Sequence, residues 1–265
     1  MPNNATTNTV SDIAYSATIQ RTSYNIPHIT AQSLPNAWFG QGYAMAEDRI
    51  CIVLDQVIKV RGQRAKLFGP GEYDANIESD FAYKHLGLLA DAERNLASLP
   101  SDIQEMLTAH AAGINRYLAD SGAAKLPAPC LNSKWLVTVT PADLLAIATD
   151  FNIFLSSRFL APLLSNVSPP SQNSAPKEAS PPSDKQAKPG SNGWAIGGDL
   201  TSSGNGILLA QPHFPWEGAL QAWESHVSVP EQLDVYGITI PGIPNNLVGF
   251  NSKVAWTVTV TTRKG

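Results

Sequence analysis

The sequence has little of what several classes of protein require. Its 265 residues include only two cysteines, and 18 Lys and Arg residues against 22 Asp and Glu residues give a formal net charge of −4. The basic residues form no cluster, which excludes the positive face of a typical nucleic-acid-binding protein. No apolar run approaches the ~20 residues that a membrane-spanning helix needs. With 43% hydrophobic residues, however, the chain can bury a sizeable core and is expected to be globular.

Aromatic residues are absent from residues 165–190, and six of the 20 prolines fall in this stretch. A segment rich in Pro, Ser, Lys and Asn cannot bury enough apolar surface to fold, so it is expected to be mobile and accessible to proteases. An interdomain linker is one interpretation. The segment ends, however, at the small-residue sequence Gly190-Ser191-Asn192-Gly193, which favours a spacer peptide that is excised during maturation.

No Gly-x-Ser-x-Gly nucleophile elbow surrounds Ser191, which argues against an ordinary Ser-His-Asp hydrolase. An N-terminal serine needs no distant base, because its own α-amine titrates near ~7.7 to 8.0 and accepts the hydroxyl proton. Cleavage before Ser191 would create such a residue. Gly190 has no Cβ, so the serine oxygen can approach its carbonyl group for an N-to-O acyl shift. A simple turn is the alternative interpretation of the same four residues.

The pattern is mainly helical before residues 165–190 and strand-like after them. Apolar residues at helical spacing predict an amphipathic helix over residues 46–67. Ser101-Asp102-Ile103-Gln104 matches a capping box, and Pro141 after Thr140 indicates the start of a third helix. Short β-rich runs separated by Gly, Pro and Asn then predict the beginning of an antiparallel sheet, over residues 193–196, 206–210, 221–229, 233–240, 247–250 and 254–262.

Several blocks of the sequence resemble those of one enzyme family. Residues 191–198 (SNGWAIGG) and 206–216 (GILLAQPHFPW) are similar to the start of the catalytic β chain in the penicillin acylase family of N-terminal nucleophile hydrolases. Residues 21–29 (RTSYNIPHI) and 42–48 (GYAMAED) resemble the α-chain signatures of that family. The likeness is greatest to the branch of acyl-homoserine-lactone acylases and aculeacin A acylase.

This resemblance implies an α+β fold, the four-layer αββα sandwich of N-terminal nucleophile hydrolases, incomplete in this chain. It divides the chain into a mainly helical, α-chain-like segment (1–164), an excised spacer (165–190) and the N-terminal part of a catalytic β chain (191–265). Family β chains continue for several hundred residues and supply an asparagine side chain to the oxyanion hole. We therefore expect a chain that stops at Gly265 to be truncated and inactive alone.

The resemblance also implies roles for single residues. Ser191 would be the nucleophile both in self-cleavage after Gly190 and in substrate turnover. His213 would position the nucleophile and support processing, although without the resemblance it is more simply a structural, hydrogen-bonded ring. Val260, matched by register alone, would donate its backbone N–H to the oxyanion hole. Asn192 would orient the amine, or serve only as a turn residue.

Four aromatic residues are candidate substrate contacts. Phe214 matches an aromatic that gates an acyl pocket in the lactone-acylase branch, and Trp194, Trp216 and Trp256 are candidates for the walls of that pocket. Such aromatics are otherwise core residues. A hydrophobic slot of this kind would favour long acyl chains, since each buried methylene contributes ~0.8 kcal/mol.

Three positions depart from the family pattern. Val258 replaces a histidine that would support the oxyanion hole, and Asn25 stands where Gly is common, a mild change because Asn tolerates left-handed backbone geometry. Arg263 lies where penicillin G acylases place an acidic calcium ligand. The sequence therefore predicts no calcium site of that kind, and neither a metal nor another cofactor is expected.

The two cysteines, Cys51 and Cys130, permit a single disulfide. The aculeacin-like branch has a pair in similar surroundings, so a bridge is expected if the protein is exported, and two buried thiols are the alternative. Family members are usually periplasmic or secreted, yet residues 1–17 lack the basic segment and apolar run of a signal peptide.

Together these features predict a self-cleaving amidohydrolase precursor. It would hydrolyse the linear amide of N-acylated small molecules, such as acyl-homoserine lactones, lipopeptides or penicillin-type amides. Its α and β chains would stay associated after cleavage, and no nucleic-acid or membrane partner is expected. The alternative is a truncated, inactive remnant that acts only as a structural or binding module.

Overall fold

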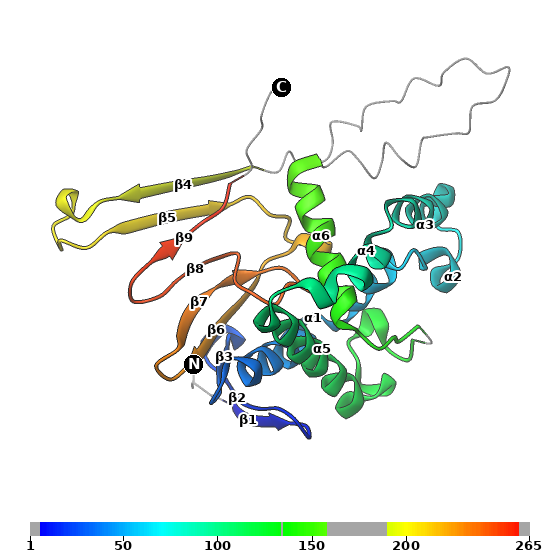
Figure 1. The fold of residues 1–265 in the computed structure, drawn as a ribbon, viewed down its shortest axis with the longest axis horizontal. Coiled ribbons are helices and arrows are strands. Elements are labelled where there is room, and N and C mark those ends of the chain that lie inside the picture. The colour runs from blue at the N-terminus through cyan, green and yellow to red at the C-terminus, as the bar shows by residue number, and fades with distance from the viewer. Residues whose placement is uncertain (1–5, 134, 158–189, 260–265) are drawn as a thin grey trace, which may run out of the picture.

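The computed structural model describes residues 6–133, 135–157 and 190–259, and the structural statements below refer to these ranges. Helices gather on one side of the molecule and a twisted sheet on the other (Figure 1). This arrangement confirms the predicted α+β class. The described residues account for one sheet and the helical layer that packs on it, together with a separate two-stranded hairpin.

The part of the chain before residue 158 is mainly helical after three short strands. Its elements are β1 (Thr6–Ser11), β2 (Ser16–Arg21), β3 (Pro27–Thr30), α1 (Leu34–Val60), α2 (Arg64–Phe68), α3 (Ala75–Leu86), α4 (Leu88–Asn95), α5 (Ser101–Ser121) and α6 (Pro141–Ser157). The part from residue 190 onward is built from strands. They are β4 (Ser191–Ile196), β5 (Ile207–Pro212), β6 (Trp223–Val229), β7 (Leu233–Thr239), β8 (Val248–Phe250) and β9 (Ala255–Trp256).

A seven-stranded sheet joins the two parts of the chain in the order β1-β2-β3-β6-β7-β8-β9. All neighbours are antiparallel except β3 and β6, which pair in parallel with His28 opposite His226. The two rings meet across this junction, where the Nδ1 atoms lie 2.9 Å apart, and His226 Nε2 lies 2.6 Å from Asp234 Oδ1. Segments on both sides of residues 165–190 therefore form one sheet.

Helix α1 begins twelve residues before the predicted start, at Leu34 instead of Ala46. Gly40 and Gly42 weaken the helical signal in the sequence because glycine is a poor helix former. In the folded protein these two glycines let the helix pack closely against its neighbours. A Cβ on Gly40 would lie 2.6 Å from Ala17 Cβ of β2, and one on Gly42 would lie 2.2 Å from the His110 carbonyl oxygen of α5.

The predicted capping box at the start of α5 is wrong. Ser101 is already helical, and the N-cap is Pro100, which makes no side-chain capping hydrogen bond. Gln104 donates instead to the carbonyl oxygen of Leu99, at 2.7 Å. At α6 the prediction holds, since Pro141 is the first residue of the helix.

The reciprocal cap that the sequence places at α5 occurs in the structure just before α6. The Thr140 hydroxyl accepts from the Asp143 N–H at 3.2 Å, and Asp143 Oδ2 accepts from the Thr140 N–H at 2.8 Å. Arg61, which follows α1, donates to both oxygens of the fully buried Asp143. A cap and an ion pair thus fix the start of α6 against the end of α1.

The core lies between α1, its neighbouring helices and the inner face of the sheet. Its largest fully buried apolar side chains are Ile29, Phe39, Met45, Ile50, Leu54, Ile58, Ile114, Leu144, Ile147 and Ile240. Cys51 of α1 and Cys130 form a disulfide with their Cα atoms 5.5 Å apart. Both cysteines precede residue 158, so this bond does not link the two parts of the chain.

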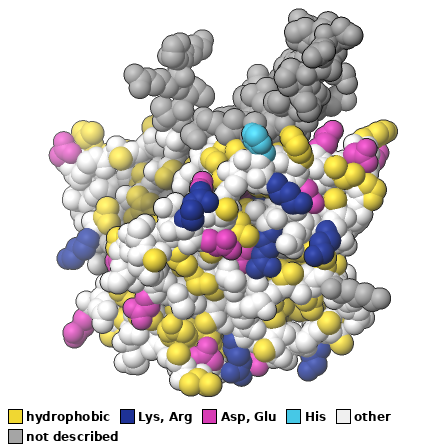
Figure 2. Space-filling model, turned by 45° about the vertical axis from the view of Figure 1, so that its right-hand side comes forward, with side chains coloured by type: hydrophobic (Ala, Val, Ile, Leu, Met, Phe, Trp, Pro, Cys, Tyr) yellow, Lys and Arg dark blue, Asp and Glu magenta, His cyan; other side chains and the backbone are white. Residues whose placement is uncertain are grey.

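The strands after Ser191 follow the predicted runs with one exception. The last run is shorter, because β9 covers only Ala255–Trp256 and residues 257–259 are not strand. None of the helices in the described ranges is long and apolar enough to cross a membrane. On the face seen in Figure 2, basic and acidic side chains are interspersed with apolar ones.

Candidate active site

Ser191 is the first residue of β4, in a hairpin that extends beside the main sheet (Figure 1). Strands β4 and β5 pair antiparallel with Ser191 opposite Pro212, and a ten-residue connection, 197–206, joins them. No side chain of the two strands is fully buried. One face of the hairpin exposes Trp194 by 51% and Leu209 by 58%. The predicted nucleophile is therefore carried by a lightly packed element.

The Gly190–Ser191 peptide has two hydrogen-bond donors on its carbonyl oxygen. Ser191 Oγ donates to the Gly190 oxygen at 2.5 Å, and the backbone N–H of His213 donates to the same oxygen at 3.1 Å. The His213 nitrogen also lies 3.4 Å from Ser191 Oγ. The hairpin thus holds the serine hydroxyl beside the carbonyl group that precedes it, and aims an N–H at that carbonyl.

The His213 ring is held by polar side chains of the hairpin. Asn192 Nδ2 lies 3.2 Å from His213 Nε2 and donates to Gln211 Oε1 at 3.1 Å. Because a carboxamide NH2 group can only donate, His213 Nε2 is the acceptor in this contact. Nδ1 of the same ring lies 3.4 Å from the position that a Cβ on Gly190 would occupy.

Residues 257–259 run close beside β4 and reach Ser191. Thr259 Oγ1 donates to the Ser191 carbonyl oxygen at 3.0 Å. A Cβ on Gly193 would lie 2.7 Å from Thr257 Cγ2, so the glycine is what permits this approach. Val260, the predicted oxyanion-hole donor, lies outside the described residues, directly after Thr259. Val258, at the position where the resemblance leads us to expect a histidine, is 38% exposed.

The four predicted substrate-binding aromatics do not share one pocket among the described residues. Phe214 is half-buried and packs against Phe151 of α6, with ring centroids 6.3 Å apart. Trp194 stands on the exposed face of the hairpin, and Trp216 is 95% exposed. Trp256 instead lines a cavity beneath the sheet.

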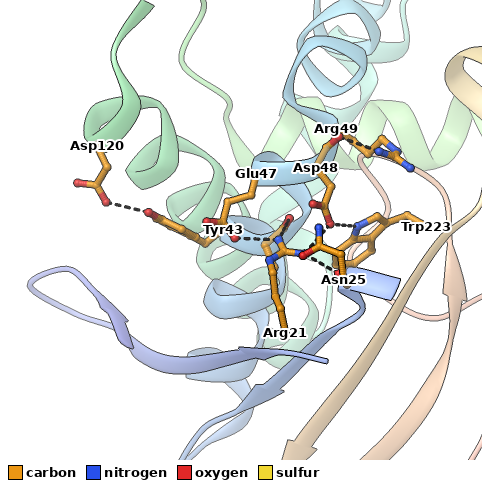
Figure 3. Close-up of polar contacts among 9 residues, drawn as sticks. Arg21, Asn25, Tyr43, Glu47, Asp48, Arg49, Asp120 and Trp223 are labelled. Carbon is orange, nitrogen blue, oxygen red and sulfur yellow. Dashed lines mark hydrogen bonds and ion pairs between the residues drawn. The ribbon is translucent and has the colours of Figure 1, made fainter. Parts of the chain in front are cut away.

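The two α-chain-like sequence blocks meet in an ion network that the sequence reasoning did not foresee (Figure 3). Arg21 donates to Glu47 Oε2 at 2.8 Å, to Asp48 Oδ2 at 3.1 Å and to the Asn25 carbonyl oxygen at 2.9 Å. Trp223 Nε1 of β6 also donates to Asp48 Oδ2, at 2.8 Å. These motif residues therefore tie β2, α1 and β6 together.

Charge and backbone geometry both suit this network. Burial lowers the pKa of Arg21, but its hydrogen bond to Glu47 and the charge of Asp48 raise that pKa by more, so it lies above the usual arginine value. Asn25 has a φ of 62°, in the left-handed region that was expected to tolerate Asn in place of Gly. Asn adopts left-handed backbone angles more readily than most residues, because its short polar side chain can form local hydrogen bonds.

No group of three or more His, Cys, Asp or Glu side chains within the described ranges is arranged to hold a metal ion. Arg263 lies outside those ranges. The sequence reasoning also passed over Gln211 and Thr259. The pairing of Gln211 with Asn192 follows from the register of the hairpin, which the sequence does not reveal. Thr259 lies next to Val260 in a run that the sequence predicts only as a strand.

The penicillin amidase family model matches residues 16–265 of the chain. The chain therefore belongs to the penicillin amidase family, which confirms the predicted family. Among its curated relatives is acyl-homoserine lactone acylase PvdQ of Pseudomonas syringae pv. syringae (strain B728a). That protein is 34% identical over 263 residues, which make up 94% of this chain and 34% of the relative.

A second curated relative is aculeacin-A acylase of Actinoplanes utahensis. It is 32% identical over 270 residues, covering 96% of this chain and 34% of that protein. The chain thus spans about a third of the length of these relatives. A solved structure of thermostable penicillin G acylase from Alcaligenes faecalis aligns with a TM-score of 0.46 and 21% identity, covering 65% of this chain and 99% of that chain. The relatives are named as acylases, so the chain is related to hydrolases of amides.

Proposed function

We propose that this chain is part of a self-cleaving acylase that splits the Gly190–Ser191 bond and uses the freed Ser191 as its nucleophile. One observation carries the proposal. The Ser191 hydroxyl and the His213 backbone N–H both hydrogen-bond to the Gly190 carbonyl oxygen. Negative charge develops on that oxygen when a nucleophile attacks the carbonyl carbon, and a fixed N–H donor stabilises such charge most in the transition state.

Self-cleavage would proceed in two balanced steps. In the N-to-O shift, the bond from Ser191 Oγ to the Gly190 carbonyl carbon forms and the C–N bond breaks, while the hydroxyl proton passes to the liberated amine. Water then hydrolyses the resulting ester, which leaves a carboxylate on Gly190 and restores the hydroxyl. Removing one oxyanion donor from an acyl-transfer enzyme slows it about 10²–10³-fold, which sets the scale for the contribution of the His213 N–H.

In turnover the new α-amine of Ser191 would act as the base. It accepts the Oγ proton as the oxygen attacks the substrate amide, and passes it to the departing amine of the substrate. Water then releases the acyl group from the serine. The Val260 N–H would supply one donor to the substrate oxyanion, and the Asn192–His213 contact would keep the serine surroundings in place.

The proposed substrates are N-acylated small molecules. The names of the relatives support acyl-homoserine lactones and the acylated peptide aculeacin A as classes, with penicillin-type amides as a further class. Phe214, Trp194 and Trp216 are proposed contacts for the acyl part, whereas Trp256, the fourth predicted contact, lines a cavity apart from Ser191. Their apolar rings would favour longer acyl chains.

We further propose that residues 165–190 are removed and that residues 1–164 and 191–265 remain associated. The disulfide cannot hold them together, because both cysteines lie before the cleavage site. The parallel pairing of β3 with β6 and the Trp223–Asp48 hydrogen bond provide the non-covalent link. A disulfide in the first part supports a periplasmic or secreted location, since such bonds persist in oxidising compartments.

The test is intact-mass measurement of the purified chain, which has a mass of 28.3 kDa uncut. Wild-type protein is expected to yield a fragment that begins at Ser191, and S191A is expected to stay intact. S202A, in the connection of the same hairpin, is the matched control and should be cut like the wild type. A wild-type chain that stays whole while folded would overturn self-cleavage and leave the inactive-module alternative.

Activity needs a separate measurement, because the chain spans only part of its relatives. A form that adds a complete homologous β chain is expected to release fatty acid from an N-acyl homoserine lactone, whereas its S191A variant is not. Cleavage at Ser191 without any amide hydrolysis in the completed form would contradict the acylase proposal but not self-cleavage.

A further inference from the structure

A cavity of about 270 Å³ lies between α1 and the inner face of the sheet. Its walls include Trp38 of α1, Val227 of β6, Val235 of β7 and Trp256 of β9. Asn245 and Asn246, from the loop between β7 and β8, also line it. It is separate from the contacts around Ser191, and no charged side chain lines it.

Two carboxamides in this cavity have no hydrogen-bond partner. Gln41 is fully buried, and neither Nε2 nor Oε1 finds a partner in the structure. Asn246 is half-buried as a residue, but both of its amide atoms are shielded from solvent and unpartnered. Buried polar groups in folded proteins are almost always hydrogen-bonded to protein, water or ligand. These four atoms therefore indicate that a bound molecule supplies their hydrogen-bond partners.

The packing of α1 explains why Gln41 is held there. There is no room for a Cβ on Gly40, which would lie 2.7 Å from Ile29 Cγ2 of the sheet, or on Gly42, which would lie 2.2 Å from the His110 carbonyl oxygen of α5. Helix α1 therefore packs tightly between the sheet and α5, and it cannot rotate to bring the amide of Gln41 to solvent.

We propose that this cavity binds a small neutral molecule with an amide-like head and an apolar body. Water alone fits poorly, because each enclosed water needs two to four polar partners and occupies about 30 Å³. The cavity has room for several waters, but its only polar side chains besides the indoles are the carboxamides of Gln41, Asn245 and Asn246, set among largely indole and aliphatic walls. An amide head can donate to and accept from Gln41 and Asn246, while an alkyl body fills the apolar remainder. This inference does not rest on the proposed function.

The experiment titrates the whole chain with pentanamide and follows both the melting temperature and saturation-transfer NMR. S191A is used as the background, so that neither self-cleavage nor hydrolysis affects the result. Pentanamide is expected to raise the melting temperature in a saturable way. Pentanoate, the anion of similar shape, is expected to bind at least tenfold more weakly, because no cation lines the cavity to receive it.

Q41M tests the contact directly, since methionine keeps the length and volume of the side chain but removes both orphan atoms. It should weaken pentanamide binding at least tenfold and leave the unliganded chain folded. Q56M is the matched control: Gln56 is a buried residue of the same helix with an unpartnered Oε1, yet it does not line the cavity. Pentanamide affinity should be unchanged in Q56M.

Three results would overturn the inference. Pentanamide could fail to bind the folded S191A chain, Q41M could bind it as tightly as the parent, or a crystal grown with pentanamide could show ordered water only in the cavity. N246L provides a second variant should Q41M not fold. It too should lose at least tenfold in affinity, and unchanged binding in N246L would count against the proposal.

Discussion

Helix α1 and the β4–β5 hairpin represent opposite extremes of packing in this protein. The helix buries 16 of its 27 residues, whereas no residue of β4 or β5 is fully buried. The helix is held by close contacts to the sheet and to α5, and the hairpin by hydrogen bonds within itself and to Thr259. Side chains proposed for chemistry therefore lie on an element with little tertiary support, where local hydrogen bonds must set their geometry.

The comparison predicts that an added methyl group is costly where α1 and α5 pack together and mild at an open position of the hairpin connection. In G113A the new Cβ would lie 2.0 Å from the Phe39 carbonyl oxygen of α1. Two backbones would have to separate, so we expect a loss of about 3 kcal/mol or more in the free energy of unfolding, the upper end of overpacking effects.

G206A, at the end of the hairpin connection, is the control for G113A. Its Cβ would meet only the Ile196 carbonyl oxygen, at 3.6 Å, so the expected change is within about 0.5 kcal/mol. Urea unfolding followed by circular dichroism measures both variants. Equal effects in the two would remove the distinction between core and hairpin.

A smaller loss is expected from R21M in the ion network beside α1. The variant leaves Glu47 and Asp48 facing each other without their cation in a partly buried site. Breaking a buried pair typically costs about 3–5 kcal/mol, and the partial exposure of Glu47 places the expected cost at about 2–3 kcal/mol.

R94M, which removes the exposed pair of Arg94 with Asp91 on α4, is the matched control for R21M. Exposed pairs contribute ~0–1 kcal/mol, so its effect should be far smaller in the same urea experiment. If the R21M chain were as stable as the R94M chain, the Arg21 ion network would contribute no more to the free energy of unfolding than an exposed ion pair.

Buried and half-buried histidines outside the hairpin predict a pH dependence of stability. Burial lowers the pKa of His110 to about 3, and burial together with His226 lowers the pKa of His28. His110 has a pKa near 6.5 in the unfolded chain. Below that pH the unfolded chain binds a proton on His110, whereas the folded chain does not. Stability is therefore full above that pH and falls as pH decreases towards 3, by about 1.4 kcal/mol per pH unit from this one residue.

Urea unfolding between pH 7 and pH 4 measures this slope. H110L should flatten it, while H85Q, a change at an exposed histidine of α3, should leave it as it is. A slope that survives in H110L would assign the pH dependence to other groups.

The smallest effect on stability, with a clear effect on rate, is expected from N192A in the hairpin. It removes the donor to His213 Nε2 without touching the core, so the melting temperature should stay within about 1 °C. Self-cleavage should slow about tenfold, which corresponds to about 1.4 kcal/mol of activation free energy. Timed mass spectra measure the rate, with S202A as the control. A rate equal to wild type would mean that Asn192 is only a turn residue.

The predictions from sequence were most accurate for elements that are specified by residues close together in the chain. Alternating apolar residues and Gly, Pro and Asn turns gave the strands after Ser191, and Pro141 gave the start of α6. The prediction failed at the start of α1 because glycines that permit close packing look like helix breakers when only neighbours along the chain are considered. The capping-box prediction failed at α5 because a capping serine must precede the helix. Here Pro100 takes the N-cap position and Ser101 is the first helical residue.

The sequence by itself determined the family, the position of Ser191 behind a proline-rich segment and the order of helical and strand-like parts, because each depends on residues close together in the chain. Only the tertiary structure decided that β3 pairs with β6, that Arg21 joins Glu47 and Asp48, and that Gln41 faces a cavity. These contacts join residues far apart in the chain. Their partners are chosen by the packing of whole elements, which no short pattern encodes.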